Sequence, residues 1–365
     1  MLERAPSQVK QILVTGGAGF IGSNFIDLVL ESNQGVSVVC LDSLSYAGNV
    51  VNLESAVKHP NFTFVKADLC DGDGLGSALD PFDFDWVFHF AAETHVDRSI
   101  HEPKITVMTN VIGTLNLLEY FRGHWLNEIQ SHKRLVHIST DEVYGAIQDG
   151  LFSETSRYKP SSPYSASKAG SDHLVTAYFT TFGLPTLTTW CTNNYGPRQH
   201  PEKLIPLMTI HALEGKPLPV YGDGLQVRDW LHVHDHAAGV WQTALRGKVG
   251  EGYCFSGGLE STVTNLDVVN QILEVVSAHL KVEKSELDGL ITHVEDRLGH
   301  DRRYALDSRK AAVELRWTPK IPFQSGFAKT VEWYLNHSEW MKEVQGTDYK
   351  DWLSRNYSQP KGGHQ

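Results

Sequence analysis

Short apolar runs alternate with helical patterns through the first half of the chain. The apolar runs have the composition of buried strands, and they occupy residues 11–14, 37–41, 62–66, 86–90, 135–138 and 186–190. Segments with a helical pattern lie among them, at residues 23–31, 106–120 and 164–182. Strands that alternate with helices form parallel sheets covered on both faces. The pattern therefore predicts an α/β fold with a Rossmann-type, doubly wound parallel sheet.

The alternation breaks up after residue 196, where prolines become frequent. We expect one more strand of the sheet at 253–256, preceded by a helix at 236–245 that Asp235 caps. A helix capped by Thr264, a strand at 291–294 and a helix at 323–335 then form a smaller C-terminal α/β domain. The predicted boundaries are 9–196 and 232–258 for the large domain, 197–231 and 259–357 for the small domain, and 1–8 and 358–365 for loose termini.

Charge and composition exclude several classes of function. The chain has 365 residues and a formal net charge of −11, which argues against a general nucleic-acid-binding surface. No apolar run approaches the roughly 20 residues that a membrane-spanning helix needs, and residues 1–10 lack the apolar core of a signal peptide. The four cysteines stand far apart without CxxC spacing. We expect reduced thiols in a cytoplasmic protein without nucleic-acid or membrane partners.

A glycine-rich turn follows the first predicted strand. Gly16, Gly19 and Gly22 allow a tight turn and the approach of a pyrophosphate, and the helix that follows offers free N–H groups. Asp42 ends the second strand 20 positions after Gly22, where an acidic side chain binds the ribose hydroxyls of a dinucleotide. Its charge would repel a 2′-phosphate, which favours NAD over NADP. A glycine turn without any ligand is the alternative.

Three reactive side chains follow the strand at 135–138. Thr140, Asp141 and Glu142 are consecutive, and ligands of open α/β sheets bind outside the carboxyl ends of the strands. Two neighbouring carboxyl groups seldom titrate alike, so one can act as an acid while the other acts as a base. The alternative is an ordinary turn in which Asp141 is a cap and Glu142 is solvated.

A tyrosine and a lysine open the helix at 164–182. The spacing of Tyr164 and Lys168 places both on one helical face. A free tyrosine has a pKa of about 10, too high for a base at neutral pH. A nearby ammonium group and a cationic nicotinamide ring would both favour the phenolate. After a dinucleotide fingerprint this YxxxK pattern indicates a catalytic pair, whereas a surface tyrosine beside a surface lysine is the alternative.

Later segments carry groups that could bind phosphate or metal. Residues 201–204 and 221–228 combine backbone groups, aromatic rings and cations that suit a nucleotide diphosphate, and so do the arginines at 297–303. Solvated charges are the alternative in each case. His232 and His234 would share one face of a strand, as zinc ligands often do. No cysteine pair accompanies them, and we expect no metal.

These motifs, in this order, resemble the extended short-chain dehydrogenase/reductase family, and within it the dTDP-glucose 4,6-dehydratases. The likeness extends from about residue 11 to 357, and its most specific runs are 43–49, 90–100, 139–145, 162–174, 193–197, 201–207 and 299–305. The run Thr140-Asp141-Glu142 resembles a dehydratase, because epimerases of the family usually lack this acid pair. Leu298 departs from the family pattern, which has proline there, and this puts the fit around the diphosphate in question.

The resemblance implies a lyase that converts dTDP-glucose to dTDP-4-keto-6-deoxyglucose with bound NAD. Tyr164, tuned by Lys168, would take the 4-OH proton while hydride leaves C4, and Thr140 would hold that hydroxyl. Glu142 would then remove the C5 proton and a protonated Asp141 would release O6 as water, before hydride returns to C6. The resemblance also implies a homodimer through the helices around residues 106–120 and 167–182.

The resemblance implies two further sets of contacts. The residues implied for NAD are Gly16, Gly19, Phe20, Ile21, Gly22, Asp42, Ser43, Leu44, Ser45, Asp68, Leu69, Phe90, Ala91, Ala92, Thr109, Tyr164, Lys168 and Asn194. The residues implied for the nucleotide-sugar substrate are Thr94, Thr140, Asn193, Lys203, Leu204, Pro219, Tyr221, Arg228, Asn265, Arg297 and His300.

Three other functions stay open at this point. The same reaction on UDP-glucose is one, because thymine and uracil differ by one methyl group, worth only about 1–3 kcal/mol in an apolar pocket. A nucleotide-sugar 4-epimerase or decarboxylase of the same fold is the second. The third is a non-catalytic NAD-binding sensor or scaffold, although a sensor has no need for a complete set of acid and base residues.

Overall fold

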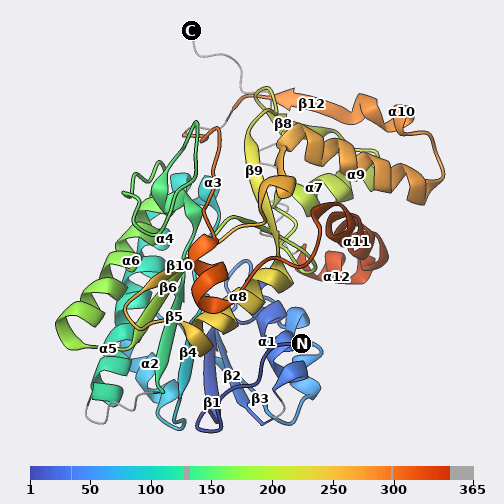
Figure 1. Ribbon diagram of the computed structural model, residues 1–365. Coiled ribbons are helices and arrows are strands. Elements are labelled where there is room, and N and C mark those ends of the chain that lie inside the picture. Colours follow the sequence, from blue (N-terminus) through green and yellow to red (C-terminus); the bar gives the residue numbers. More distant parts are fainter. Residues whose placement is uncertain (34, 127–131, 297–298, 346–365) are drawn as a thin grey trace.

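The computed structural model describes residues 1–33, 35–126, 132–296 and 299–345. A seven-stranded sheet forms its larger part, with all neighbouring strands parallel and the order β3-β2-β1-β4-β5-β6-β10 (Figure 1). The strands are β1 (Gln11–Thr15), β2 (Ser37–Asp42), β3 (Phe62–Lys66), β4 (Trp86–His89), β5 (Arg134–Ile138), β6 (Thr186–Cys191) and β10 (Gly252–Phe255). The predicted doubly wound Rossmann-type sheet is confirmed.

Helices cover both faces of this sheet. Side chains alternate along a strand, so Ile12 of β1 packs with α1 and α8 on one face while Leu13 packs with α2, α5 and α6 on the other. The covering helices are α1 (Phe20–Ser32), α8 (Val233–Arg246), α2 (Gly72–Leu79), α5 (Thr114–Trp125) and α6 (Pro163–Phe182). Both faces of the sheet are therefore sealed, and ligands must approach its edge or the ends of its strands.

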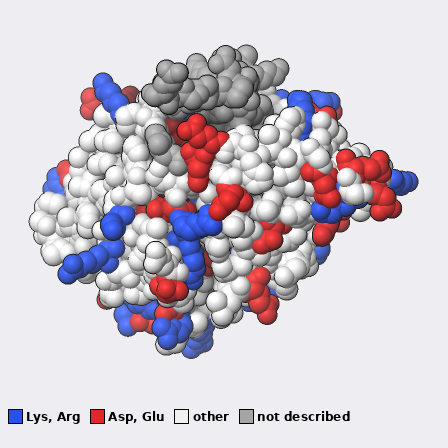
Figure 2. Space-filling view, turned by 90° about the horizontal axis from the view of Figure 1, so that it is seen from above, with Lys and Arg blue, Asp and Glu red and all other residues white. Residues whose placement is uncertain are grey.

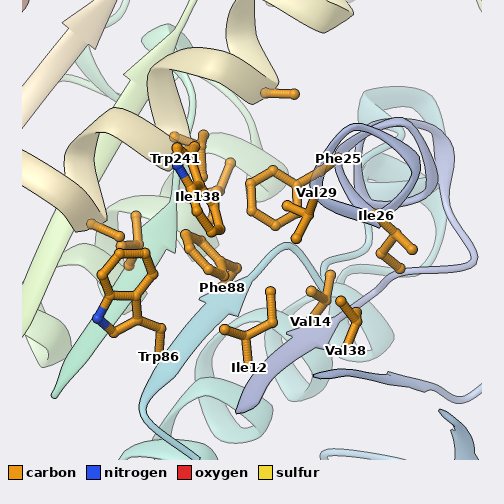
Figure 3. Packing of buried hydrophobic residues seen from close by; sticks show 14 of the residues in the cluster. Ile12, Val14, Phe25, Ile26, Val29, Val38, Trp86, Phe88, Ile138 and Trp241 are labelled. Carbon is orange, nitrogen blue, oxygen red and sulfur yellow. The ribbon is translucent and has the colours of Figure 1, made fainter. Parts of the chain in front are cut away.

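Large aromatic side chains fill the layer between the sheet and helices α1 and α8. Phe25 of α1 lies 4.5 Å from Phe88 of β4, centroid to centroid, and Trp241 of α8 stacks on Phe88 at 6.0 Å (Figure 3). Trp86 meets Trp241 edge to face at 5.2 Å. Such aromatic contacts add to the stabilisation that comes from area burial. This layer fixes α1, and with it the glycine turn that precedes α1, against the centre of the sheet.

The C-terminal part packs around a second apolar core and two small sheets (Figure 1). One sheet has the order β11-β9-β7 and the other pairs β12 with β8. These strands are β7 (Asn193–Tyr195), β8 (Leu218–Tyr221), β9 (Val227–His232), β11 (Thr262–Thr264) and β12 (Ile291–Val294). The helices around them are α7 (Leu204–Leu213), α9 (Asn265–Leu280), α10 (Lys284–Leu287), α11 (Phe323–Asn336) and α12 (Ser338–Val344).

Short helical segments complete the described chain. They are η1 (Val50–Leu53), η2 (Ala56–Lys58), α3 (Val96–His101), α4 (Pro103–Val107), η3 (Met108–Gly113), η5 (Asp141–Tyr144), η6 (Leu259–Ser261), η7 (Asp288–Leu290) and η8 (Ala311–Leu315). The single helix predicted at 106–120 is therefore wrong in detail, because a π-helical turn, η3, separates α4 from α5. Such turns often occur at functional sites.

Two predicted helix caps have different outcomes. Thr264 caps α9 as expected, since its hydroxyl accepts the N–H of Asp267 and the Asp267 carboxylate reaches back to the Thr264 N–H. Asp235 is not the cap of α8. That helix begins at Val233, and the ring of His232 accepts the His234 N–H. The Asp235 carboxylate instead accepts the N–H groups of Lys320 and Ile321 and fastens the segment before α11.

The histidine motif and the N-terminus also differ from expectation. His232 ends β9 whereas His234 lies in α8, so the two do not share a face of one strand. The residues with assigned positions contain no group of metal-binding side chains. In the N-terminal segment 1–8, the carbonyl oxygen of Glu3 accepts a hydrogen bond from the indole N–H of Trp241, and the Glu3 carboxylate accepts one from Arg246. None of the helices in the described ranges is long and apolar enough to cross a bilayer.

Candidate active site

A cavity of about 430 Å³ opens at the carboxyl ends of the central strands. Loops after β1, β2, β3, β4, β5 and β6 line it, as expected for the point where the strand order reverses between β1 and β4. It is lined by these residues of the sequence-predicted site: Gly16, Gly19, Phe20, Ile21, Gly22, Asp42, Ser43, Ser45, Asp68, Leu69, Phe90, Ala91, Ala92, Thr94, Thr109, Thr140, Asp141, Glu142, Tyr164, Lys168, Asn193, Asn194 and Lys203.

The glycine turn lies against the end of β4. Gly16 has a φ of +69°, and a Cβ built on it would lie only 2.5 Å from the backbone nitrogen of Ala91. Glycine is therefore required here both for the left-handed conformation and for space. The turn leads into α1 at Phe20, whose N-terminal N–H groups face the end of the sheet. This arrangement fits the pyrophosphate of a dinucleotide.

Asp42 stands at the end of β2 beside the glycine turn. Its carboxylate accepts the N–H groups of Ala18 at 2.9 Å and Leu44 at 2.8 Å. Burial raises the pKa of this carboxyl although both N–H bonds act in the opposite direction. Its position fits the expected contact with ribose hydroxyls. Leu44, the one predicted NAD contact that does not line the cavity, has a φ of 58° and turns the chain away after β2.

Thr140 and Asp141 form a buried polar pair at the end of β5. The Thr140 hydroxyl accepts the Glu142 N–H and thereby caps the short helix η5, and it donates to Oδ1 of Asp141 at 3.3 Å. Burial, reinforced by the charges of Glu142 and Asp229, raises the pKa of Asp141 well above its usual range. Its Oδ2 has no hydrogen-bond partner among the described residues. The raised pKa favours the protonated carboxyl group, which can act as an acid.

Tyr164 and Lys168 enter the same cavity from the first turns of α6. The Lys168 ammonium donates to the carbonyl oxygen of Ile138 at 2.7 Å, and burial lowers the pKa of Lys168 to about 8. Burial and the charge of Glu142 raise the pKa of Tyr164 well above its usual value. The prediction counted the charges of the Lys168 ammonium group and of a cationic nicotinamide ring, whereas burial and the neighbouring carboxylate act in the opposite direction.

The residues implied for the substrate divide into two groups. Thr94, Thr140, Asn193 and Lys203 line the cavity, and the Lys203 ammonium donates to the carbonyl oxygen of Thr94 at 3.0 Å. The others do not line it. They are Leu204, Pro219, Tyr221, Arg228, Asn265 and His300, on α7, β8, β9, the start of α9 and the segment after β12. Arg297 and Leu298 lie outside the described residues.

Several members of the outer group are near one another. Arg228 of β9 packs over the ring of Tyr304 at 4.5 Å and donates to the carbonyl oxygen of Asp301 at 3.0 Å. The ring of His300 meets the ring of Tyr221 edge to face at 6.1 Å. Arg228 and Tyr221 thus lie near the segment 300–304, which includes His300. Figure 2, seen from above, shows positive and negative side chains intermingled rather than one basic patch.

Sequence reasoning missed a cluster of charged residues on the cavity wall. Glu93, His200 and Glu202 line the cavity, and Arg98 donates to the Glu202 carboxylate at 3.3 Å. Burial raises the pKa values of Glu93 and Glu202 despite the charge of Arg98. From the sequence, the run 201–204 suggested contacts from its backbone groups, Lys203 and Leu204, and no role for Glu202. His200 and Lys203 are also polar, so no local pattern marked Glu202 as a buried acid.

Comparison with known proteins identifies the family. A family model described as GDP-mannose 4,6 dehydratase matches residues 13–330. The dTDP-glucose 4,6-dehydratase of Escherichia coli is 47% identical over 360 residues, which cover 95% of this chain and 99% of the relative. The chain belongs to the nucleotide-sugar 4,6-dehydratases. Membership of this family confirms the resemblance that the motifs indicated, and it extends over both the sheet and the C-terminal part.

Solved structures of the dehydratase family agree with this assignment. The dTDP-glucose 4,6-dehydratase of Bacillus anthracis in complex with NAD is 44% identical, with a TM-score of 0.81 over 92% of this chain and 99% of that chain. DesIV of Streptomyces venezuelae, solved with NAD and TYD bound, is 43% identical with a TM-score of 0.83 and the same coverage. A UDP-glucose 4-epimerase of Thermotoga maritima is only 29% identical, with a TM-score of 0.78 over 89% and 99%.

Proposed function

We propose that the protein dehydrates dTDP-glucose to dTDP-4-keto-6-deoxyglucose and water. One observation carries the proposal: the buried Asp141 and the neighbouring Glu142 lie in the same cavity as Tyr164 and Lys168, and burial raises the pKa of Asp141. Elimination of water needs an acid and a base. The Tyr164–Lys168 pair by itself would suit a simple oxidation, and the two carboxyl groups are what a dehydratase adds.

Each residue has one task in this proposal. The Thr140 hydroxyl binds the sugar 4-OH, and the Tyr164 oxygen takes the proton from that hydroxyl while Lys168 stabilises the phenolate. The resulting 4-ketone acidifies C5–H, and Glu142 takes that proton. Asp141 gives its proton to O6, which leaves as water. As C6 is reduced, Glu142 returns its proton to C5, and the proton held by Tyr164 replaces the one that Asp141 gave up. The stoichiometry then balances, because the sugar loses one water and the oxidation at C4 is matched by reduction at C6.

NAD is the cofactor of this family, and the chain has the groups to hold it. The turn at Gly16 and the start of α1 would bind the pyrophosphate, and Asp42 would bind the adenosine ribose. When bound, NAD stores the hydride between C4 and C6, and its cationic ring favours the phenolate. The Asp42 carboxylate at the cavity wall would repel a 2′-phosphate, which supports NAD over NADP.

Incubation with dTDP-glucose and catalytic NAD tests the function. We expect a 4-keto-6-deoxy product and no net reduction of NAD. UDP-glucose, run in parallel, should give a kcat/KM lower by about 10-fold or more if an apolar contact to the thymine methyl exists. Equal values would point to a nucleotide-tolerant 4,6-dehydratase. Binding of NAD without any keto product from either sugar would favour the sensor reading.

Two substitutions separate the dehydratase from an epimerase or decarboxylase of the same fold. Asp141→Asn and Glu142→Gln keep the shapes of the side chains and remove the proton donor and acceptor. In a dehydratase both should abolish most of the turnover, whereas an epimerase would keep it nearly intact. The lower identity to the epimerase of known structure already disfavours that alternative.

We also propose a homodimer, formed through the helices around 106–120 and 167–182. Ile105, Val107 and Met108 around the η3 turn and Phe182 at the end of α6 are all at least 38% exposed, which is unusual for large apolar side chains. Sedimentation analysis should give twice the monomer mass. Val107→Asp should shift the mass toward the monomer, and exposed Val313→Asp on the η8 turn should leave it unchanged.

Domain boundaries and location complete the proposal. We propose an NAD-binding domain of residues 9–196 and 232–258 and a nucleotide-sugar domain of residues 197–231 and 259–357. Support comes from the strands of the large sheet, all of which fall in the first set. We propose a cytoplasmic protein, supported by the four cysteines, none of which is paired.

A further inference from the structure

The carboxylate of Asp172 is buried one helical turn beyond Lys168. Tyr164, Lys168 and Asp172 follow one another at intervals of four residues on α6, so they lie along one side of the helix. Tyr164 and Lys168 line the cavity, whereas Asp172 lies behind them and is only 2% exposed. A buried carboxylate is costly unless its charge and its oxygens are satisfied. The groups that satisfy Asp172 therefore indicate why it is there.

Neutral donors from several parts of the fold surround this carboxylate. Oδ2 accepts the hydroxyl groups of Ser139 and Tyr158, each at 2.9 Å, and the indole N–H of Trp190 at 3.0 Å. Oδ1 lies 3.1 Å from Nε2 of His137. The three donors satisfy Oδ2, whereas Oδ1 lies beside the His137 ring without a well-aligned hydrogen bond from any described residue. Uncharged groups also leave the negative charge itself without a counter-charge.

Lys168 supplies the opposite charge. Burial lowers the pKa of His137 to about 4, so this ring is neutral at pH 7. Burial likewise lowers the pKa of His89 well below its usual value and raises those of Tyr158 and Cys191, which keeps these neighbours uncharged. Burial alone would raise the pKa of Asp172, but bonds from His137 and Trp190 and the charge of Lys168 together hold it below its usual value. In return the Asp172 charge opposes the desolvation of Lys168.

The same carboxylate joins the two halves of the active site. Ser139 donates a hydrogen bond to Asp172. The residue before it, Ile138, has the carbonyl oxygen that accepts a hydrogen bond from the Lys168 ammonium group. The residue after it, Thr140, begins the turn that carries Asp141 and Glu142. Asp172 on α6 thus holds the end of β5 at the point from which both the lysine contact and the turn depart. A shift of about 1 Å in such a support can cost two orders of magnitude in rate.

We propose that Asp172 is a positioning residue of this site, a buried counter-charge for Lys168 that also ties α6 to the Thr140–Asp141–Glu142 turn. The proposal rests on the proposed function for its catalytic consequence, because Lys168 acts only if the C4 oxidation occurs. Asp172 does not line the cavity.

The pH dependence of turnover tests the charge. Asp172→Asn keeps the shape and most hydrogen bonds but removes the charge, while Tyr158→Phe removes one hydrogen bond and keeps the charge. We expect the alkaline limb of the kcat/KM profile, where Lys168 loses its proton, to move by about half a pH unit or more toward acid in Asp172→Asn only. A merely structural role would lower stability in both variants without moving the limb. An Asp172→Asn limb that coincides with wild type overturns the proposal.

Two further measurements keep the test decisive. Thermal unfolding of wild type, Lys168→Met, Asp172→Asn and the double variant needs no substrate, and we expect the double variant to be less destabilised than the sum of the single variants. If the losses of stability in the two single variants simply add in the double variant, the proposal is wrong. This result does not depend on whether the protein turns over dTDP-glucose. If Asp172→Asn yields no folded protein, Ser139→Ala tests the proposal instead. Loss of the hydrogen bond between Ser139 and Asp172 should lower kcat by about threefold or more with little change in KM. An unchanged kcat overturns the proposal.

Discussion

Replacement of Gly16 by alanine should damage NAD binding through two separable effects. The first is conformational, because a φ of +69° places a residue with a Cβ in the left-handed region at a cost of about 1–2 kcal/mol. The second is steric. The new Cβ would lie 2.5 Å from the nitrogen and 2.6 Å from the Cα of Ala91, whereas ordinary contacts are 3.4–4 Å. The backbone of Ala91 must therefore retreat, at a cost of about 1–3 kcal/mol for overpacking.

Gly150 offers a matched control for the conformational part. Its φ is +83°, but no atom lies within 4 Å of the position that a Cβ would take. Gly150→Ala should therefore cost about 1–2 kcal/mol of unfolding free energy and nothing in NAD affinity. Gly16→Ala should cost about 2–5 kcal/mol, and the displaced turn should weaken NAD binding by about tenfold or more.

Urea denaturation and calorimetric titration with NAD measure the two quantities. The informative quantity is the difference in NAD affinity between Gly16→Ala and Gly150→Ala. If Gly16→Ala binds NAD as tightly as Gly150→Ala does, the contact between the turn and Ala91 does not shape the cofactor site, and our assignment of the pyrophosphate to this turn is wrong.

Three other perturbations have definite expected outcomes. Asp141→Asn should lower kcat by about 10²–10⁴-fold with folding intact, because it removes a general acid; stopped assays of the keto product check this, and a smaller loss would contradict the assigned role. Trp241→Ala should cost about 3–5 kcal/mol in urea unfolding, because the indole is fully buried; a cost within 1 kcal/mol of zero would contradict the packing. Burial lowers the pKa of His236 to about 3. Between this value and the unfolded value of about 6.5 the unfolded state binds the proton and the folded state does not, so stability decreases as the pH is lowered. From pH 7 to 5 wild type should lose about 2 kcal/mol more than His236→Gln in thermal unfolding, and equal losses would refute the buried neutral ring.

Local patterns were sufficient to predict the sheet and the reactive residues of the cavity. Ile12 and Leu13 are apolar because β1 is buried on both faces, so the strand could be recognised as a continuous apolar run. Thr140, Asp141 and Glu142 could be placed at a ligand site because every parallel strand delivers its next residues to the same edge. Both inferences need only neighbouring residues and the chirality of the fold.

Features that depend on distant parts of the chain escaped prediction. Asp235 was predicted to cap α8, but its carboxylate instead accepts the N–H of Lys320, 85 positions later in the sequence. The pKa of Tyr164 depended on burial and on Glu142, a residue 22 positions earlier in the sequence. Glu202 lines the cavity, where its carboxylate accepts a hydrogen bond from Arg98 of α3, 104 positions earlier in the sequence. In each case the sequence contains both partners and no local sign that they meet.

Burial shifts the pKa values of Asp141 and Lys168 in opposite directions, and only the shift of Asp141 favours the form that the proposed reaction needs. Desolvation disfavours the charged form of either group. It raises the pKa of Asp141, which suits a proton donor, and it lowers the pKa of Lys168 to about 8, close to the point where the cation would be lost. A nearby buried anion such as Asp172 favours the cation. A site that relied on burial alone would gain its acid and lose its lysine, so a dedicated counter-charge is what allows one water-poor cavity to carry both chemistries.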